Sequence, residues 1–149
     1  MNFKEKVYQY YCDVAGERVD MLQKVMAALK DSAANETKSS AGDKHETALA
    51  MLQIEQANTG AQLEDALAKK NVLKKIDPAL RTSAVVNGSL VKTNLGYLFL
   101  SAALGKATID QYQIIALSPQ SPLGQKLRGL KVGDTARILT MEYFIEEIQ

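Results

Sequence analysis

Apolar positions in the first half of the chain recur every three or four residues. The first series consists of Phe3, Val7, Tyr10, Val14, Met21, Val25 and Leu29. The second consists of Leu49, Leu52, Leu63, Leu67 and Ile76, with the polar Gln56 inside it. This spacing predicts two amphipathic helices, over about residues 3–33 and 44–75. The polar stretch NETKSSAG at residues 35–42 predicts the turn between them.

Two such helices, joined by a short turn, are expected to pack as an antiparallel coiled coil. A turn centred at about residue 38 or 39 places position numbers that sum to about 77 opposite one another. The predicted facing pairs are Val25 with Leu52, Val14 with Leu63, Tyr10 with Leu67 and Phe3 with Leu73. Gly16 then lies opposite Gly60, which indicates either a close approach of the two backbones or a coincidence. We predict a helical hairpin over residues 1–76 with its tip at about 35–46.

The second half of the chain contains short β-branched or aromatic runs separated by turn residues. The candidate strands are residues 83–86, 89–93, 97–102, 111–117, 135–140 and 143–148. Ser121 in an N-cap position and Pro122 in the first turn predict a short helix that Gly129 ends. The predicted fold class is α+β: a helical hairpin followed by an antiparallel β domain with one short helix, over residues 79–149.

The amino-acid composition disfavours several classes of function. Of the 149 residues, 46% are hydrophobic and 23% charged, as in a folded globular protein. Eighteen basic against seventeen acidic residues give a net charge of +1, which offers no basis for general binding to nucleic acid or membrane surfaces. With Cys12 and His45 the only residues of their kinds, a self-contained enzyme is disfavoured. The single cysteine and the lack of a membrane-length apolar stretch predict a cytoplasmic protein without a membrane partner.

Residues 117–134, LSPQSPLGQKLRGLKVGD, resemble the C-terminal domain of the Gre family of bacterial transcription elongation factors. The family pattern there is Ile-Ser-x-x-Ser-Pro, a short helix, then Gly-Lys-x-x-Gly-Asp. The matching positions are Leu117, Ser118, Ser121, Pro122, Gly129, Gly133 and Asp134. The sequence Gly-Asp-Lys-His-Glu at residues 42–46 is similar to Gly-Asp-x-x-Glu at the family's coiled-coil tip. The resemblance implies an FKBP-like fold for the C-terminal domain.

The resemblance also implies a function. Gre factors dock their C-terminal domain at the secondary channel of RNA polymerase and insert the hairpin, whose tip acids help a Mg²⁺ ion to cleave backtracked RNA. By resemblance, Asp43 and Glu46 are these catalytic and metal-binding acids, and Mg²⁺ is shared with the polymerase. The resemblance further implies that this chain is a monomer without a cofactor of its own. It also implies that the chain is not itself an enzyme and that it contacts nascent RNA only through the polymerase. The implied docking residues are Ser118, Ser121, Pro122, Lys126 and Arg128.

Other interpretations stay open. Asp43 and Glu46 have the spacing of a capping box, which requires only helix physics. Where the family continues with Asn-Ala-Glu-Tyr, this chain reads Thr-Ala-Leu-Ala at residues 47–50. A Gre-like modulator or inhibitor that enters the channel without stimulating cleavage is therefore one alternative. A coiled-coil adaptor or chaperone-like module that does not bind polymerase is another.

Overall fold

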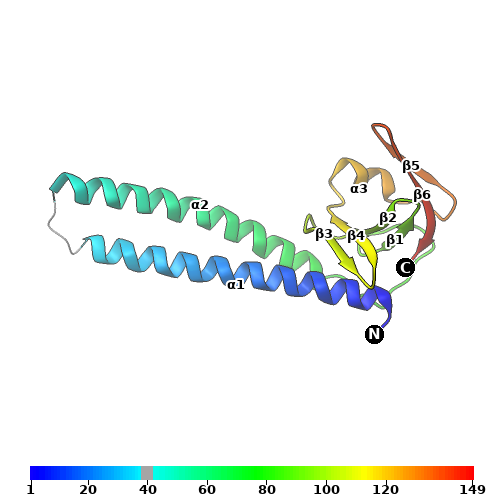
Figure 1. The fold of residues 1–149 in the computed structure, drawn as a ribbon, viewed down its shortest axis with the longest axis horizontal. Helices are drawn as coiled ribbons and strands as arrows, with labels where there is room; N and C mark the ends of the chain where they lie inside the picture. Colours follow the sequence, from blue (N-terminus) through cyan, green and yellow to red (C-terminus); the bar gives the residue numbers. More distant parts are fainter. Residues whose placement is uncertain (38–41) are drawn as a thin grey trace. The chain divides into compact units, whose positions relative to one another are not determined.

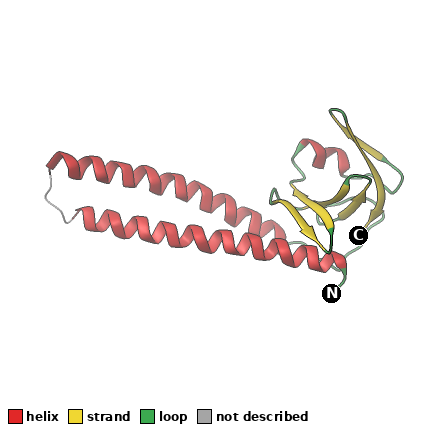
Figure 2. Cartoon of the chain, viewed as in Figure 1, coloured by secondary structure: helices red, strands yellow, loops and turns green. Residues whose placement is uncertain are grey.

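Two long helices precede a six-stranded mixed sheet with one short helix, so the predicted α+β class is confirmed (Figures 1 and 2). The computed structural model describes residues 1–37 and 42–149, and it describes no side chain from residue 37 to residue 45. The helices are α1 (Phe3–Thr37), α2 (Gly42–Lys74) and α3 (Pro122–Leu127). The strands are β1 (Leu90–Thr93), β2 (Gly96–Leu100), β3 (Gly105–Ile109), β4 (Tyr112–Leu117), β5 (Thr135–Ile138) and β6 (Met141–Ile148).

The long helices begin and end close to their predicted bounds. Asn2 caps α1, because its Oδ1 accepts a hydrogen bond of 2.9 Å from the Glu5 amide. The helix continues to Thr37, beyond the predicted residue 33, through an alanine-containing stretch with no glycine or proline to stop it. The central part of the predicted tip, residues 38–41, lies outside the described residues.

The residues group into two compact units. One unit, here called the sheet unit, contains Met1–Val14 and Lys69–Gln149. The other, here called the hairpin unit, contains Ala15–Ala68. The start of α1 and the end of α2 thus belong with the sheet. The predicted domain limits, 1–76 and 79–149, stay a prediction.

The seam of the hairpin unit lies one residue away from its predicted position at three points of α1, and Leu29 lies in it as predicted. Its buried members there are Ala15, Val19 and Leu22, and Met26 and Leu29 are half-buried. The spacing of apolar residues predicts Val14, Met21 and Val25 in the seam instead, but the exposed fractions of Met21 and Val25 are 46% and 41%. The position of the seam is ambiguous in the sequence because several apolar residues occur in adjacent pairs, and either member of a pair fits a spacing of three or four residues. These pairs are Tyr10 and Tyr11, Val14 and Ala15, Met21 and Leu22, and Val25 and Met26.

The register between the helices also differs from the prediction. Leu63 packs against the cluster of Val19, Leu22 and Ala66 rather than opposite Val14. This shift corresponds to about two helical turns along α1. Gln56 lies in the seam and donates from Nε2 to the Leu29 carbonyl over 3.3 Å.

Of the two interpretations of Gly16 and Gly60, the structure excludes the close approach of their backbones. A Cβ on Gly60 would meet the methyl group of Met26 at 3.5 Å, whereas a Cβ on Gly16 would meet nothing within 4 Å. The two glycines therefore do not face each other.

The sheet has the strand order β3-β4-β2-β1-β6-β5. Four strand pairs are antiparallel as predicted, but β2 and β4 are parallel, with Tyr97 opposite Ile114. The parallel pair arises because β3, which the sequence analysis did not predict, forms the edge and pairs with β4, leaving β4 beside β2. The predicted strand at 83–86 contributes only an isolated bridge between Ala84 and Lys131.

Both faces of the sheet are covered. On one face, α3 contributes Leu127 to a core with Val91, Leu98 and Ile145. On the opposite face, the start of α1 brings Tyr11 against Phe99, with ring centroids 6.0 Å apart. Alternation along β2 accounts for this, because Leu98 and Phe99 point to opposite sides of the strand.

Polar groups near the start of α1 tie it to the rest of the sheet unit. The Tyr11 hydroxyl donates to the Gly105 carbonyl over 2.9 Å, and burial raises the pKa of Tyr11 to about 12. Lys4 is buried and donates from Nζ to the Leu80 carbonyl over 2.6 Å. Burial, and then the nearby Arg81 charge, lower the pKa of Lys4. The first three turns of α1 are therefore an integral part of this unit.

Candidate functional site

The segment that carries the family resemblance forms a turn and helix held by its own serines. The Ser121 hydroxyl donates to the Ser118 carbonyl over 2.6 Å and accepts from the Gly124 amide over 3.1 Å, so it is the N-cap of α3. The Ser118 hydroxyl donates to Oε1 of Gln120 over 2.6 Å and accepts from the Gln120 amide. Both predicted docking serines therefore use their hydroxyls within the segment.

Pro122 and Gly124 fix the first turn of α3. Pro122 occupies the first helical position, where no amide donor is needed, and its side chain is exposed. Gly124 is buried, and a Cβ there would overlap the Ser118 carbonyl oxygen. The turn therefore requires glycine at this position, and it presents Pro122 outward from a rigid backbone.

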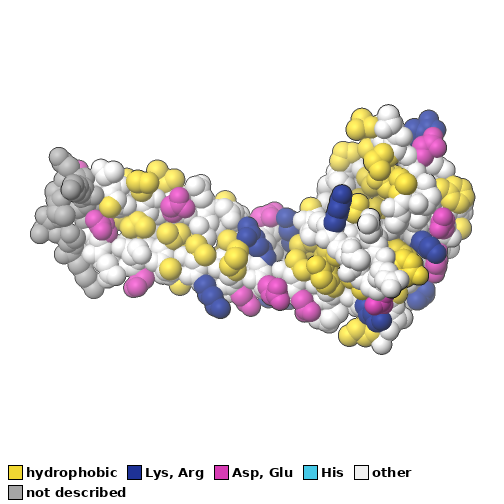
Figure 3. Space-filling view, in the orientation of Figure 1, with side chains coloured by type: hydrophobic (Ala, Val, Ile, Leu, Met, Phe, Trp, Pro, Cys, Tyr) yellow, Lys and Arg dark blue, Asp and Glu magenta, His cyan; other side chains and the backbone are white. Residues whose placement is uncertain are grey.

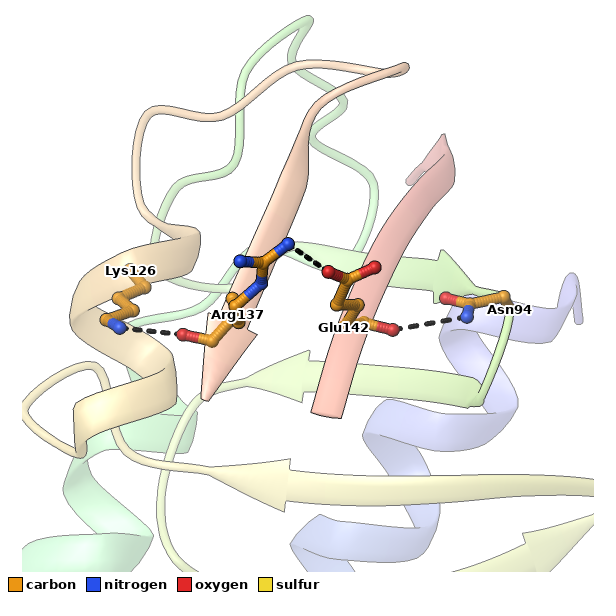
Figure 4. Close-up of polar contacts among 4 residues, drawn as sticks. All are labelled: Asn94, Lys126, Arg137 and Glu142. Carbon is orange, nitrogen blue, oxygen red and sulfur yellow. Dashed lines mark hydrogen bonds and ion pairs between the residues drawn. The ribbon is translucent and has the colours of Figure 1, made fainter. Parts of the chain in front are cut away.

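Lys126 braces the sheet edge rather than projecting freely. Its Nζ donates to the Arg137 carbonyl on β5 over 2.6 Å (Figure 4). The Arg137 guanidinium pairs with the Glu142 carboxylate across the β5–β6 hairpin, and Nδ2 of Asn94 donates to the Glu142 carbonyl over 3.2 Å. Because its ammonium is held in this way, Lys126 is a positioning residue for α3, which the sequence analysis did not foresee.

Arg128 is an exposed cation at the end of this segment. Its side chain lines a groove of about 440 Å³ together with Val86, Asn87 and Gln125. Within residues 1–37 and 42–149, no hydrogen bond or ion pair involves its guanidinium. An exposed surface, which we call the α3 surface, is thus formed by Pro122 and Gln125 of α3 and by Arg128, its C-cap. Its arginine and amides suit a polar protein partner.

The sequence analysis did not identify Gln125 and Asn87 as residues of this site. Gln125 lies one helical turn after Ser121 in α3, and its Nε2 donates to the Gln120 carbonyl over 2.8 Å. Asn87 precedes Gly88 in a turn whose only sequence signal was the Asn-Gly pair. A signal for Gln125 existed in its helical spacing from Pro122 and Arg128.

Of the two predicted tip acids, the structure describes the side chain of Glu46 but not that of Asp43. Glu46 is exposed on α2, near its start. Asp43 belongs to the first turn of α2, and its side chain lies outside the described part of the chain. Within the described residues, no group of three or more His, Cys, Asp or Glu side chains is placed to hold a metal ion. The capping-box and metal-binding interpretations of this pair both stay predictions.

Among the described residues, no helix combines the length and apolarity that a bilayer span requires.

Comparison with known proteins yields a distant likeness among solved structures. No protein-family model and no curated protein sequence matches the chain. The crystal structure of GreA factor homolog 1 (Gfh1) of Thermus thermophilus is 17% identical over 88% of this chain and 94% of that chain, with a TM-score of 0.35. A structure of the transcription factor Gfh1 is 18% identical over 96% of this chain and 91% of that chain, with a TM-score of 0.32.

Proposed function

We propose that this chain binds bacterial RNA polymerase through the α3 surface and presents the start of α2 to the polymerase's secondary channel. The observation that carries the proposal is the construction of residues 118–128. The segment with the family motif is braced by Ser118, Ser121 and Lys126, and it leaves Pro122 and Arg128 exposed. A rigid, exposed segment binds at low cost in conformational entropy.

The finer part of the proposal is stimulation of transcript cleavage by Asp43 and Glu46. Glu46 is exposed, and a carboxylate oxygen is the type of ligand that Mg²⁺ prefers. A single described carboxylate does not make a complete site, so it fits an ion held mainly by the polymerase. When bound, that ion supplies Lewis-acid chemistry and an activated water. Under this proposal, Asp43 and Glu46 orient the ion, and the chain itself is not an enzyme.

The test is a transcript-cleavage time course on stalled, backtracked bacterial elongation complexes. Glu46→Gln and Asp43→Asn keep side-chain size and remove charge, so each is expected to reduce stimulation about 10-fold or more. Glu55→Gln is the matched control, because Glu55 is an exposed acid further along α2. Equal stimulation by Glu46→Gln, Asp43→Asn and the unmodified chain would contradict the assigned role.

A second candidate is a modulator that occupies the channel without stimulating cleavage. The observation that favours it is the sequence after Glu46: Thr47, Ala48, Leu49 and Ala50 carry no acid, and the next acid in α2 is Glu55. In the same assay, binding without any cleavage stimulation identifies this candidate. Failure to bind polymerase favours the adaptor alternative.

A further inference from the structure

The two edges of the sheet are β3 and β5, and each belongs to a hairpin with a two-residue turn. Ile109 and Tyr112 close the first hairpin, whose turn residues Asp110 and Gln111 have φ of 50° and 71°. This is the geometry of a type I′ turn, in which the closing pair exchanges both main-chain hydrogen bonds. The main-chain groups of alternate residues, Lys106 and Thr108, therefore point away from β4.

The β5–β6 hairpin also has a two-residue turn, Leu139 and Thr140, although only Leu139 has a positive φ, of 54°. Ile138 and Met141 close that hairpin, so the main chain of Arg137 points away from β6. The Arg137 carbonyl accepts the hydrogen bond from Lys126, and α3 packs along this edge (Figure 4). The β5 edge is therefore occupied by the chain's own helix.

The β3 edge lacks such a cover. In the described part of the chain, no hydrogen bond from outside the β3–β4 ladder reaches the main-chain N–H or C=O of Lys106 or Thr108. Both residues are exposed, and a Cβ on the neighbouring Gly105 would meet nothing within 4 Å. An exposed edge with free donors and acceptors is a template for another strand.

The β3 strand is also held in place before any partner arrives. At one end, Tyr11 donates to the Gly105 carbonyl. At the other end, Lys6 pairs with Asp110 over 2.8 Å. Both anchors come from the part of α1 that lies within Met1–Val14 and belongs to the sheet unit. A preorganised edge reduces the entropic cost of adding a strand.

A groove of about 540 Å³ adjoins this edge. The side chains of Lys106, Thr108, Gln113 and Ile115 line it on the face that carries α3, as the β3–β4 register requires. Tyr143 and Met141 line it further from the edge. Among the described residues that line the groove, Lys106 is the only charged one, and none of them is a carboxylate that could neutralise it.

We infer that the β3 edge and this groove bind an extended peptide segment of a partner protein, with one acidic side chain and at least one large apolar side chain on its groove-facing side. The peptide main chain pairs with Lys106 and Thr108, as in β-strand addition. The acid pairs with the Lys106 ammonium, and the apolar side chain covers Ile115 and Tyr143. A second copy of this chain is disfavoured, because an antiparallel pairing of two β3 strands brings two Lys106 side chains onto one face. This inference is independent of polymerase binding by the α3 surface.

The test uses the full chain and the synthetic peptide Thr-Glu-Thr-Phe-Thr-Leu-Thr, blocked at both ends. We expect amide shifts in the NMR spectrum at Lys106 and Thr108, together with slower hydrogen exchange at both. Thr108→Pro removes an outward N–H without removing a β3–β4 bond, so it is expected to abolish these effects. Thr135→Pro, at an outward position of β5, is the matched control and is expected to leave binding unchanged.

A charge exchange separates side-chain recognition from non-specific adhesion. Lys106→Glu is expected to weaken the acidic peptide about 10-fold and to strengthen the version with Lys in place of Glu. Lys131→Glu, the same charge change at an exposed position outside the groove, is expected to have no such effect. The inference is overturned if the peptide leaves the β3 amides unchanged at about 1 mM, or if Thr108→Pro and Lys106→Glu bind it normally. Protection of β3 that depends on protein concentration alone, with a dimer in sedimentation, would also overturn it by identifying a second copy as the occupant.

Discussion

The two compact units of the chain differ in how deeply they bury apolar side chains. Among the described residues, most of the large, fully buried side chains belong to the sheet unit, including Tyr11, Phe99 and Ile145. Among the described residues of the hairpin unit, Val19 is the only one of that class, and Met51 and Ile54 are about 60% exposed. Apolar surface is visible along the helices in Figure 3. We conclude that a hydrophobic core stabilises the sheet unit, whereas the hairpin unit depends on helical hydrogen bonds and on the narrow apolar seam between its helices.

The largest expected effect is in the core of the sheet unit. Phe99→Ala removes a fully buried ring that contacts Tyr11, and it is expected to lower the free energy of unfolding by about 3–5 kcal/mol. Urea denaturation followed by circular dichroism measures this change. Phe144→Ala is the control, because that ring is 46% exposed and its loss is expected to cost less than about 1 kcal/mol. If both variants lowered the free energy of unfolding equally, Phe99 would not be more deeply buried than Phe144, which would contradict the described core.

A smaller effect is expected in the seam of the hairpin unit. Leu22→Ala is expected to cost about 2 kcal/mol, near the lower limit for a buried leucine because the thin seam relaxes around the cavity. Hydrogen exchange is expected to accelerate within residues 15–68 and to stay unchanged in the sheet unit.

Met21→Ala is the matched control for the position of that seam. Met21 adjoins Leu22 in the sequence and is 46% exposed, so its truncation is expected to cost less than about 1 kcal/mol. If Met21→Ala cost more unfolding free energy than Leu22→Ala, the seam would contain Met21, as the spacing of apolar residues predicted.

A smaller effect again is expected at Tyr11, where α1 is anchored to the sheet. Tyr11→Phe removes the hydrogen bond to Gly105 and is expected to cost about 1 kcal/mol near neutral pH. The tyrosine ionises near pH 10 when unfolded and near pH 12 when folded, so the unfolded state loses its proton first. Stability that Tyr11 contributes is therefore complete below pH 10 and is lost as the pH rises toward 12.

Urea denaturation at about pH 9 and about pH 11 is the corresponding measurement. The unmodified chain is expected to lose more stability between these two conditions than Tyr11→Phe does. Parallel losses in both proteins would show that Tyr11 is not buried as described.

The smallest effect is expected at the β5 edge. Lys126→Met keeps the aliphatic stem and removes the donor to the Arg137 carbonyl, and because the site is exposed the cost is expected to be below about 1 kcal/mol. Faster exchange confined to the amides of α3 and β5 is the expected signature. Faster exchange across the whole sheet unit would instead assign Lys126 a role in the core.

The sequence predicted element types well where the spacing of apolar residues was long and regular. Both long helices, the short helix after Ser121 and five of the six strands were expected near their observed positions. The edge strand β3 was not predicted, because Gly-Lys-Ala-Thr-Ile is short and half polar, and its pairing is decided by β4. The parallel pairing of β2 and β4 could not be inferred without β3.

Side-chain roles were harder to infer than elements. Helical spacing located the seam only to within one residue, because Val14 and Ala15, and again Met21 and Leu22, are adjacent apolar residues. In the candidate site, the cap formed by Ser121 followed from local sequence rules and is observed. The contact of Lys126 with Arg137 joins two distant segments, and no local rule predicts it.

The most direct test of the proposed function is the affinity of the full chain for purified bacterial RNA polymerase, measured by fluorescence anisotropy. Both the cleaving and the non-cleaving candidates require this binding. Arg128→Glu is expected to weaken it about 10-fold or more, while Lys106→Glu, the same charge change at the far edge of the sheet, is expected to leave it unchanged. Absence of binding by the unmodified chain, or equal binding by both variants, would contradict the assignment of the α3 surface as the polymerase-binding site.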